Sequence, residues 1–217
     1  MTAGLQEFED PGTSESPEFL PETAKTLVIA CGALAREILD VIKLNGWQNL
    51  AITCLPAKLH NAPDQITPRL REKIRANKDR YTRILVAYAD CGTGGLIDKM
   101  IEEEGVERIG GPHCYSFYAG QQDFDALAEQ ELGTFYLTDY MVRHFDSLIM
   151  EGMGLNKYPQ MRELMFGNYK RLVYLAQMED PKLDDLAEQA AEKLQLSYRK
   201  VFTGYGELAT FMAAAAK

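Results

Sequence analysis

Continuous apolar runs alternate along most of the chain with segments in which apolar residues recur at every third or fourth position. The runs predict buried strands, because a strand covered on both faces carries few polar residues. The recurring pattern is typical of amphipathic helices. The predicted strands are 27–30, 50–53, 83–88, 107–110, 133–137, 172–176 and 198–203. The predicted helices are 34–44, 68–77, 96–104, 139–150 and 183–194, followed by a helical tail.

This alternation predicts an α/β fold. Strands joined through helices favour parallel pairing, with helices on both faces of the sheet. We therefore expect a mostly parallel, Rossmann-like, doubly wound sheet. With 217 residues, 46% of them hydrophobic, the chain can bury a sizeable core. Residues 25–217 are expected to form a single α/β domain of two packed halves, at about 25–120 and 130–217.

The first 24 residues have a different composition. Residues 1–24 are rich in Glu, Pro, Ser and Gly and contain almost no Lys or Arg. Such a segment buries too little apolar surface to offset the entropy lost on ordering. It is expected to be a disordered acidic tail.

Charge and hydropathy narrow the classes of partner. The formal net charge is -9 at pH 7 and the pI is about 4.9. An acidic surface disfavours non-specific binding to nucleic acid or to an anionic membrane. The N-terminus has no signal-peptide pattern, and no apolar run approaches the roughly 20 residues of a membrane span. We expect a cytoplasmic protein, in which the four cysteines are reduced and either reactive or metal-binding.

Each cysteine follows a predicted strand or ends one. Cys31, Cys54, Cys91 and Cys114 all fall at predicted carboxyl ends. The carboxyl ends of parallel strands share one edge of a sheet, and ligands bind outside that edge where the strand order reverses. A single cysteine is commonly a small core residue. Four at the same topological position favour a shared site instead, with Cys54 expected to matter least.

The segment from Asp90 to Gly95 is the most distinctive turn. Its glycines allow backbone N–H groups to approach an anion at a helix N-terminus, where a thiol such as Cys91 also ionises more easily. The alternative is a plain tight turn. Arg36 is expected to pair either with an anionic ligand or with Glu37. The predicted anion-binding and substrate-binding residues are Gly92, Thr93, Gly94, Gly95, Arg36, Asp90 and Asp139.

Asp139 has a simpler alternative role, since it or Thr138 can cap the helix that follows. Inside that predicted helix, His144 is expected to be a packing histidine.

Thiolate and imidazole ligands together favour zinc or iron. We expect Cys31, Cys91 and Cys114 to be the ligands, with His113 or His60 as a fourth. No zinc-finger spacing is present, so only the fold could assemble this site. Reactive thiols without metal, and core thiols, are the alternatives.

Several segments together resemble the bacterial and archaeal family called domain of unknown function 1638. The segments are 30–34, 55–57 with 59–61, 88–95, 113–115, and 133–135 with 137–139. Members of that family lie in some genomes beside corrinoid-dependent methyltransferases. The resemblance therefore implies a supporting role in one-carbon metabolism, with a small anionic or methylated substrate and a corrinoid as a further cofactor.

The first hypothesis is a metal-dependent enzyme, such as a transferase, with zinc, iron or an iron–sulfur cluster in a Cys/His cleft. The alternative is a non-catalytic protein that binds or delivers a metal, cluster or corrinoid to a methyltransferase. A redox enzyme with paired thiols is a third hypothesis, which the lack of a Cys-x-x-Cys motif disfavours.

Overall fold

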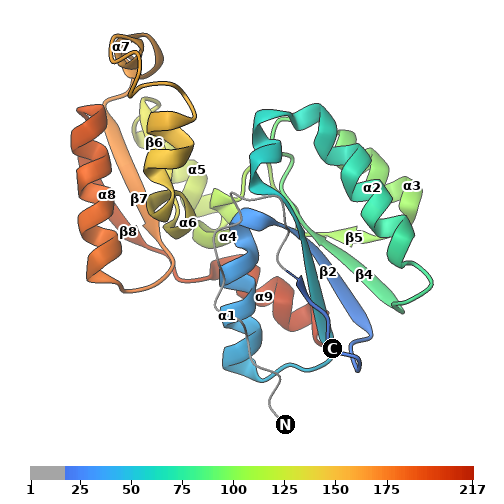
Figure 1. Ribbon diagram of the computed structural model, residues 1–217. Coiled ribbons are helices and arrows are strands. Elements are labelled where there is room, and N and C mark those ends of the chain that lie inside the picture. The colour runs from blue at the N-terminus through green and yellow to red at the C-terminus, as the bar shows by residue number, and fades with distance from the viewer. Residues whose placement is uncertain (1–17) are drawn as a thin grey trace. The chain divides into compact units, whose positions relative to one another are not determined.

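The computed structural model describes residues 18–217, which form two compact units (Figure 1). Unit 1 contains residues 18–114 and Leu208–Lys217, and unit 2 contains Tyr115–Glu207. This division differs from the expected halves, because the C-terminal helix α9 (Gly206–Ala215) returns to unit 1. There Arg83 and Asn49 donate hydrogen bonds to the carbonyls of Ala214 and Ala216, at 3.2 and 2.7 Å.

Unit 1 is built on a five-stranded sheet, sheet A. Its strands are β1 (Glu18–Phe19), β2 (Thr26–Cys31), β3 (Leu50–Leu55), β4 (Arg83–Ala87) and β5 (Glu107–Arg108). The order is β1-β3-β2-β4-β5, and every pair is parallel except β1 with β3. All residues of β2 and β3 are buried, as the apolar runs predicted.

The strand order of sheet A reverses at β2. From β2 the chain passes to β3 on one side and then returns to place β4 on the other. In open parallel sheets, the connections that leave the two neighbouring strands at such a reversal run in opposite directions. Ligands bind in the crevice outside the carboxyl ends of these two strands. In sheet A that position lies between the carboxyl ends of β2 and β4.

Helices and 3₁₀ turns connect the strands of unit 1. They are the 3₁₀ turns Gly32–Leu34, Ala57–Asn61 and Pro63–Gln65, and helices α1 (Ala35–Asn45), α2 (Ile66–Asn77) and α3 (Leu96–Glu104). Helices α2 and α3 pack side by side (Figure 1). Their ion pairs converge on Glu104, whose side chain is only 4% exposed and contacts Arg71, Arg75 and Lys78.

Unit 2 contains a second sheet, sheet B, whose strands are all parallel. The strands are β6 (Thr134–Leu137), β7 (Arg171–Ala176) and β8 (Ser197–Phe202), in the order β6-β7-β8. The helices are α4 (Tyr115–Ala119), α5 (Gln121–Gln130), α6 (Asp139–Arg143), α7 (Met161–Phe166) and α8 (Pro181–Leu194).

Both faces of sheet B are covered. Leu172 and Tyr174 of β7 pack in one core with residues of α6 and α8, whereas Val173 and Leu175 pack in another core with residues of α5. This division follows from the alternation of side chains along a strand. Helices therefore lie on both faces of this sheet, and the α/β fold with mostly parallel sheets is confirmed. The finer doubly wound arrangement stays a prediction.

Three features differ from the expectations. The predicted helix 139–150 breaks at His144 into α6 and a short π-helix, Asp146–Glu151, which places Val142, Phe145 and Ile149 in one core. Helices α4, α5 and α7 were not predicted. The expected acidic tail lies largely outside the described residues, but its last part was wrong, because Glu18–Phe19 pairs with β3.

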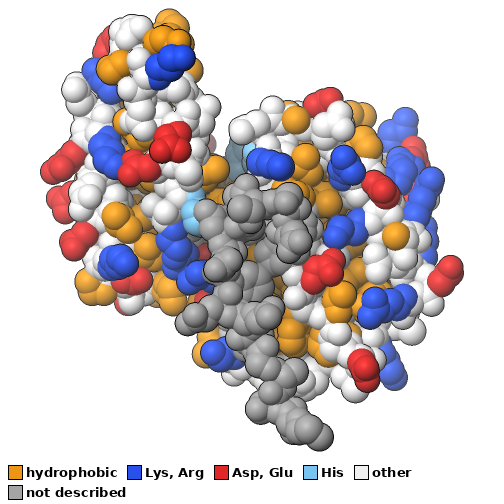
Figure 2. Space-filling model, in the orientation of Figure 1, with side chains coloured by type: hydrophobic (Ala, Val, Ile, Leu, Met, Phe, Trp, Pro, Cys, Tyr) orange, Lys and Arg blue, Asp and Glu red, His pale blue; other side chains and the backbone are white. Residues whose placement is uncertain are grey.

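Within residues 18–217, no helix is both long enough and apolar enough to span a membrane. On the face drawn in Figure 2, acidic and basic side chains are interspersed.

Candidate thiol and histidine site

Four residues with reactive side chains lie at or beyond the carboxyl ends of the strands of sheet A. Cys31 is the last residue of β2, and His60 lies in the 3₁₀ turn after β3. Cys91 lies in the turn after β4, and Cys114 follows β5. All four belong to unit 1. We call these four residues, together with Tyr88, the thiol cluster.

Cys31 and His60 are in contact. The Sγ atom of Cys31 lies 3.9 Å from Nδ1 of His60, and the same nitrogen lies 3.0 Å from the carbonyl oxygen of Ala57. The two turns approach closely because residue 32 is glycine: a Cβ there would lie 3.0 Å from the Leu55 carbonyl oxygen. The backbone thus holds the imidazole against the end of β2.

The surroundings of His60 favour its charged form. Burial of the ring lowers its pKa, but hydrogen bonds to Cys31 and Cys91 outweigh this effect and raise the pKa to about 11. Part of the residue is open to solvent, whereas the Nδ1 edge faces Cys31 and the Ala57 carbonyl. The cluster therefore combines an imidazolium with soft sulfur groups.

Tyr88 lies at the centre of the cluster. Its side chain is 0% exposed, and its ring stacks on that of His60 with 6.2 Å between the centroids and 19° between the planes. Burial raises the pKa of its phenol, and Cys31, Cys91 and Cys114 raise it further, so the hydroxyl stays protonated. Within residues 18–217, no acceptor or donor lies at hydrogen-bonding geometry to this hydroxyl, although Cys31 is near enough to raise its pKa.

Cys91 has an unusual backbone conformation. Its φ is 49°, and within residues 18–217 the only other non-glycine residue with positive φ is Gln195, at the end of α8. A non-glycine residue held in this region is often part of a functional site. The Asp90 and Cys91 N–H groups donate to the carbonyls of Gly111 and Pro112, at 3.1 and 3.3 Å. These bonds tie the Cys91 turn to the segment that carries Cys114.

The other cysteines differ in their surroundings. Burial raises the pKa of Cys114, with Cys91 and Cys31 as further causes. Burial likewise raises the pKa of Cys54, which is 0% exposed within β3 and pairs in register with Ala30. Cys54 is thus a core residue one step before the strand end.

Several hydrogen-bond donors of the Asp90–Gly95 turn are bonded to an acceptor within the same turn. The Asp90 carboxylate accepts from the Thr93 hydroxyl at 2.7 Å and from the N–H groups of Gly94 and Gly95 at 3.2 and 2.8 Å. These donors are already used, so anion binding by this turn stays a prediction that needs Asp90 to release them. Gly92 is exposed, as is Arg36 on α1, whose neighbour Glu37 is buried.

The two histidines expected as ligands are both exposed, and the one in contact with Cys31 is His60. Across the described part of the chain, no three His, Cys, Asp or Glu side chains are arranged so that they could hold one metal ion. Sequence reasoning assigned no role to Tyr88, although this residue ends the predicted strand 83–88 and begins segment 88–95 of the family resemblance.

Asp139 belongs to unit 2, at the carboxyl edge of sheet B. Its Oδ1 accepts from the Tyr174 hydroxyl at 2.7 Å and from the Gln177 N–H at 2.9 Å, and its Oδ2 lies 3.7 Å from Arg143. Burial raises the pKa of Asp139. The helix cap is supplied by Thr138, which accepts from the N–H of Met141. His144 is half-buried and packs on Tyr140, with 4.7 Å between the ring centroids.

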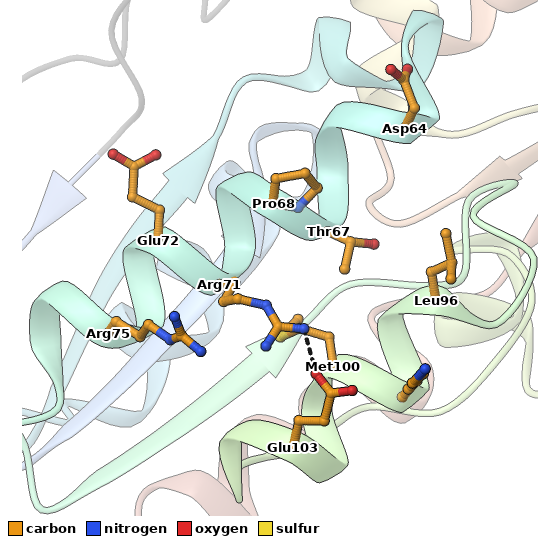
Figure 3. A pocket seen from close by; sticks show the side chains of 10 residues that line it. Asp64, Thr67, Pro68, Arg71, Glu72, Arg75, Leu96, Met100 and Glu103 are labelled. Carbon is orange, nitrogen blue, oxygen red and sulfur yellow. Dashed lines mark hydrogen bonds and ion pairs between the residues drawn. The ribbon is translucent and has the colours of Figure 1, made fainter.

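A hollow of about 750 Å³ lies elsewhere in unit 1, between α2 and α3 (Figure 3). Arg71 and Glu103 form an ion pair across it at 2.6 Å. Arg71, Arg75 and Lys99 face Asp64, Glu72 and Glu103 there, so the charges on its walls balance. None of its lining residues belongs to the thiol cluster, which we take as the candidate site on chemical grounds.

Comparison with known proteins gives one match. No curated protein and no solved structure matches this chain. The model of one protein family, described as "Protein of unknown function (DUF1638)", matches residues 54–212. The match covers His60, Tyr88, Cys91 and Cys114 and begins after Cys31. The chain therefore belongs to the DUF1638 family.

Proposed function

We propose that unit 1 holds an iron–sulfur cluster through Cys31, Cys91 and Cys114, and that the protein is an enzyme that uses this centre on a small anionic substrate. The observation that supports the proposal most strongly is the convergence of three thiols and an imidazole around Tyr88. They come from four separate connections of sheet A, beside the position where its strand order reverses.

Electrostatics favours a cationic occupant. Cys91 and Cys31 both raise the pKa of Cys114, because thiolates that lie close together repel one another. A bound metal stabilises several thiolates at once and displaces their protons. A protonated His60 ring, stacked on Tyr88, would offset part of the negative charge of the thiolates.

The placement of the candidate ligands favours a cluster over a single zinc ion. No three ligand side chains within residues 18–217 are placed for one ion. A cluster is itself several atoms wide and binds thiolates that lie further apart, with cysteine as its usual ligand. Loading would still require the contact between Cys31 and His60 to open.

Three cysteine ligands leave one iron of a four-iron cluster without a protein thiolate. His60 would supply the remaining ligand in a closed centre, whereas a substrate would bind there in an open one. A metal with an open position acts as a Lewis acid or as an electron donor to a bound molecule. The open centre is therefore the form that supports catalysis.

The test is the metal content of protein purified without oxygen and supplied with iron and sulfide. Wild-type protein should bind iron and acid-labile sulfide in near-stoichiometric amounts and show the broad visible absorption of a cluster. Cys31→Ser, Cys91→Ser and Cys114→Ser should each lose most of the iron, because each removes one thiolate ligand.

Cys54→Ser is the matched control, since Cys54 is buried in β3 behind the same edge. It should retain wild-type iron. Iron-free wild-type protein, or equal losses from Cys54→Ser and Cys91→Ser, would contradict the proposal. Zinc in place of iron would retain the ligands and replace the cluster by a single ion.

A further inference from the structure

The Tyr88 hydroxyl is a buried hydrogen-bond donor that lacks an acceptor. The side chain is 0% exposed, and no group within residues 18–217 lies at hydrogen-bonding geometry to its oxygen. Buried polar groups are nearly always paired in folded proteins, and an exception points to a missing water, ion or ligand. The hydroxyls of Tyr81, Tyr136 and Tyr198 share this feature, but Tyr88 lies among three thiols at the carboxyl edge of sheet A, which makes it the candidate for a binding position.

The surroundings of this hydroxyl restrict the ligand. Tyr88 directly follows β4, at the edge where ligands of such sheets bind. Its ring stacks on that of His60, and its phenol O–H is a hydrogen-bond donor. The ligand must therefore supply an acceptor oxygen at this position.

Unit 2 supplies an internal precedent for the acceptor. Tyr174 is also 0% exposed, and its hydroxyl donates to the Asp139 carboxylate at 2.7 Å. Both tyrosines lie near the carboxyl end of a central strand, β4 or β7. The difference is that sheet A provides no carboxylate at hydrogen-bonding geometry to Tyr88 within the described residues.

We infer that Tyr88 donates a hydrogen bond to a carboxylate oxygen of a small-molecule substrate, as Tyr174 does to Asp139, and that this oxygen lies beside the His60 ring. The inference rests on the proposed function for the role of the metal centre, because the bound carboxylate would lie beside the position that the three cysteines leave open. It names the substrate class as small carboxylic acids.

The test uses trifluoroacetate as a carboxylate probe and follows its binding to the full-length protein by ¹⁹F NMR, with acetate as competitor. Tyr88→Phe removes the hydroxyl and keeps the ring. Tyr81→Phe is the matched control: Tyr81 is 6% exposed and its hydroxyl also lacks a partner, but it precedes β4 at the opposite end of the strand.

Wild-type protein and Tyr81→Phe should bind the probe equally, and acetate should displace it. Tyr88→Phe should bind at least about tenfold more weakly, as expected for the loss of a hydrogen bond to a charged group. Absence of binding to wild-type protein, or equal binding to Tyr88→Phe, would overturn the inference.

Iron content measured on the same samples reports on the proposed function alone. Wild-type protein that binds the probe but no iron contradicts the metal centre and leaves the carboxylate site intact. If Tyr88→Phe loses iron together with probe binding, Tyr88 acts in assembling the centre, and the inference is overturned.

Discussion

The carboxyl edges of the two sheets both belong to parallel strands but use their polar residues differently. At sheet B, Asp139 accepts hydrogen bonds from Tyr174 and Gln177 and faces Arg143. At sheet A, Tyr88 lies buried among three cysteines with its hydroxyl unpaired. The comparison teaches that position in a parallel sheet does not by itself make a site. The two edges differ in the buried tyrosine hydroxyl, which donates to a carboxylate at sheet B and has no such partner among the described residues at sheet A.

The largest expected effect on stability concerns the sheet B network. Asp139→Ala removes the acceptor of two buried donors, the Tyr174 hydroxyl and the Gln177 N–H. Each unpaired buried donor costs about 1–3 kcal/mol, so the free energy of unfolding should fall by about 2–6 kcal/mol. Urea denaturation measures this change. A loss below about 1 kcal/mol would mean that the network contributes little to stability.

The matched pair of tyrosines tests the comparison more sharply. Tyr174→Phe deletes a hydrogen bond to a carboxylate and should lower the free energy of unfolding by about 1.5–3 kcal/mol. Tyr88→Phe deletes a hydroxyl without a partner and should leave this free energy unchanged or raise it. Both values come from denaturation of the metal-free protein. Equal losses of unfolding free energy in the two variants would mean that the two hydroxyls contribute equally to stability, and that the two sheets do not differ in this respect.

A pH effect is expected from the ion pairs between α2 and α3. Hydrogen bonds from Arg75 and Lys78 lower the pKa of Glu104 to about 2, from an ordinary value of 4.5. Because the folded-state pKa lies below the unfolded-state value, this contribution is present above pH 4.5 and is lost as the pH falls towards 2. The melting temperature of wild-type protein should therefore fall more steeply over this interval than that of Glu104→Gln. An equal pH dependence of the melting temperature in the two proteins would contradict the assignment of this effect to Glu104.

The smallest effect is expected at an exposed ion pair of α2. Arg69 and Glu72 lie 3.7 Å apart with side chains 61% and 72% exposed. Arg69→Ala should change the free energy of unfolding by less than about 0.5 kcal/mol, since solvent screens such pairs. A change in the free energy of unfolding above about 1 kcal/mol, measured by urea denaturation, would contradict this expectation. It would mean that this exposed ion pair contributes more to stability than the buried Tyr88 hydroxyl does.

Sequence patterns predicted the regular elements well. Helix α3 begins and ends where its apolar spacing predicts, with glycines at both ends in left-handed conformations. The strands around Val28, Ile52 and Val173 were predicted because buried parallel strands are continuous apolar runs. Helices α4 and α5 were missed because they follow one another across Gly120 without a distinct apolar period or a side-chain cap.

The candidate site could be predicted only in part. The cysteine positions follow from the strand ends, which local pattern reveals. The choice of His60 over His113 depends on the close approach of two turns at Gly32, a contact between segments far apart in sequence. Tyr88 was read as a strand residue, since burial alone does not show whether its hydroxyl finds a partner. The inward bonding of Asp90 likewise became visible only in three dimensions.

The most direct test of the central claim is X-ray absorption at the iron edge of anaerobically reconstituted protein. The proposed centre predicts sulfur neighbours together with a short iron–iron distance, and loss of both signals in Cys91→Ser but not in Cys54→Ser. A spectrum with only oxygen and nitrogen neighbours, or one unchanged in Cys91→Ser, would contradict a metal centre held by the thiols of sheet A.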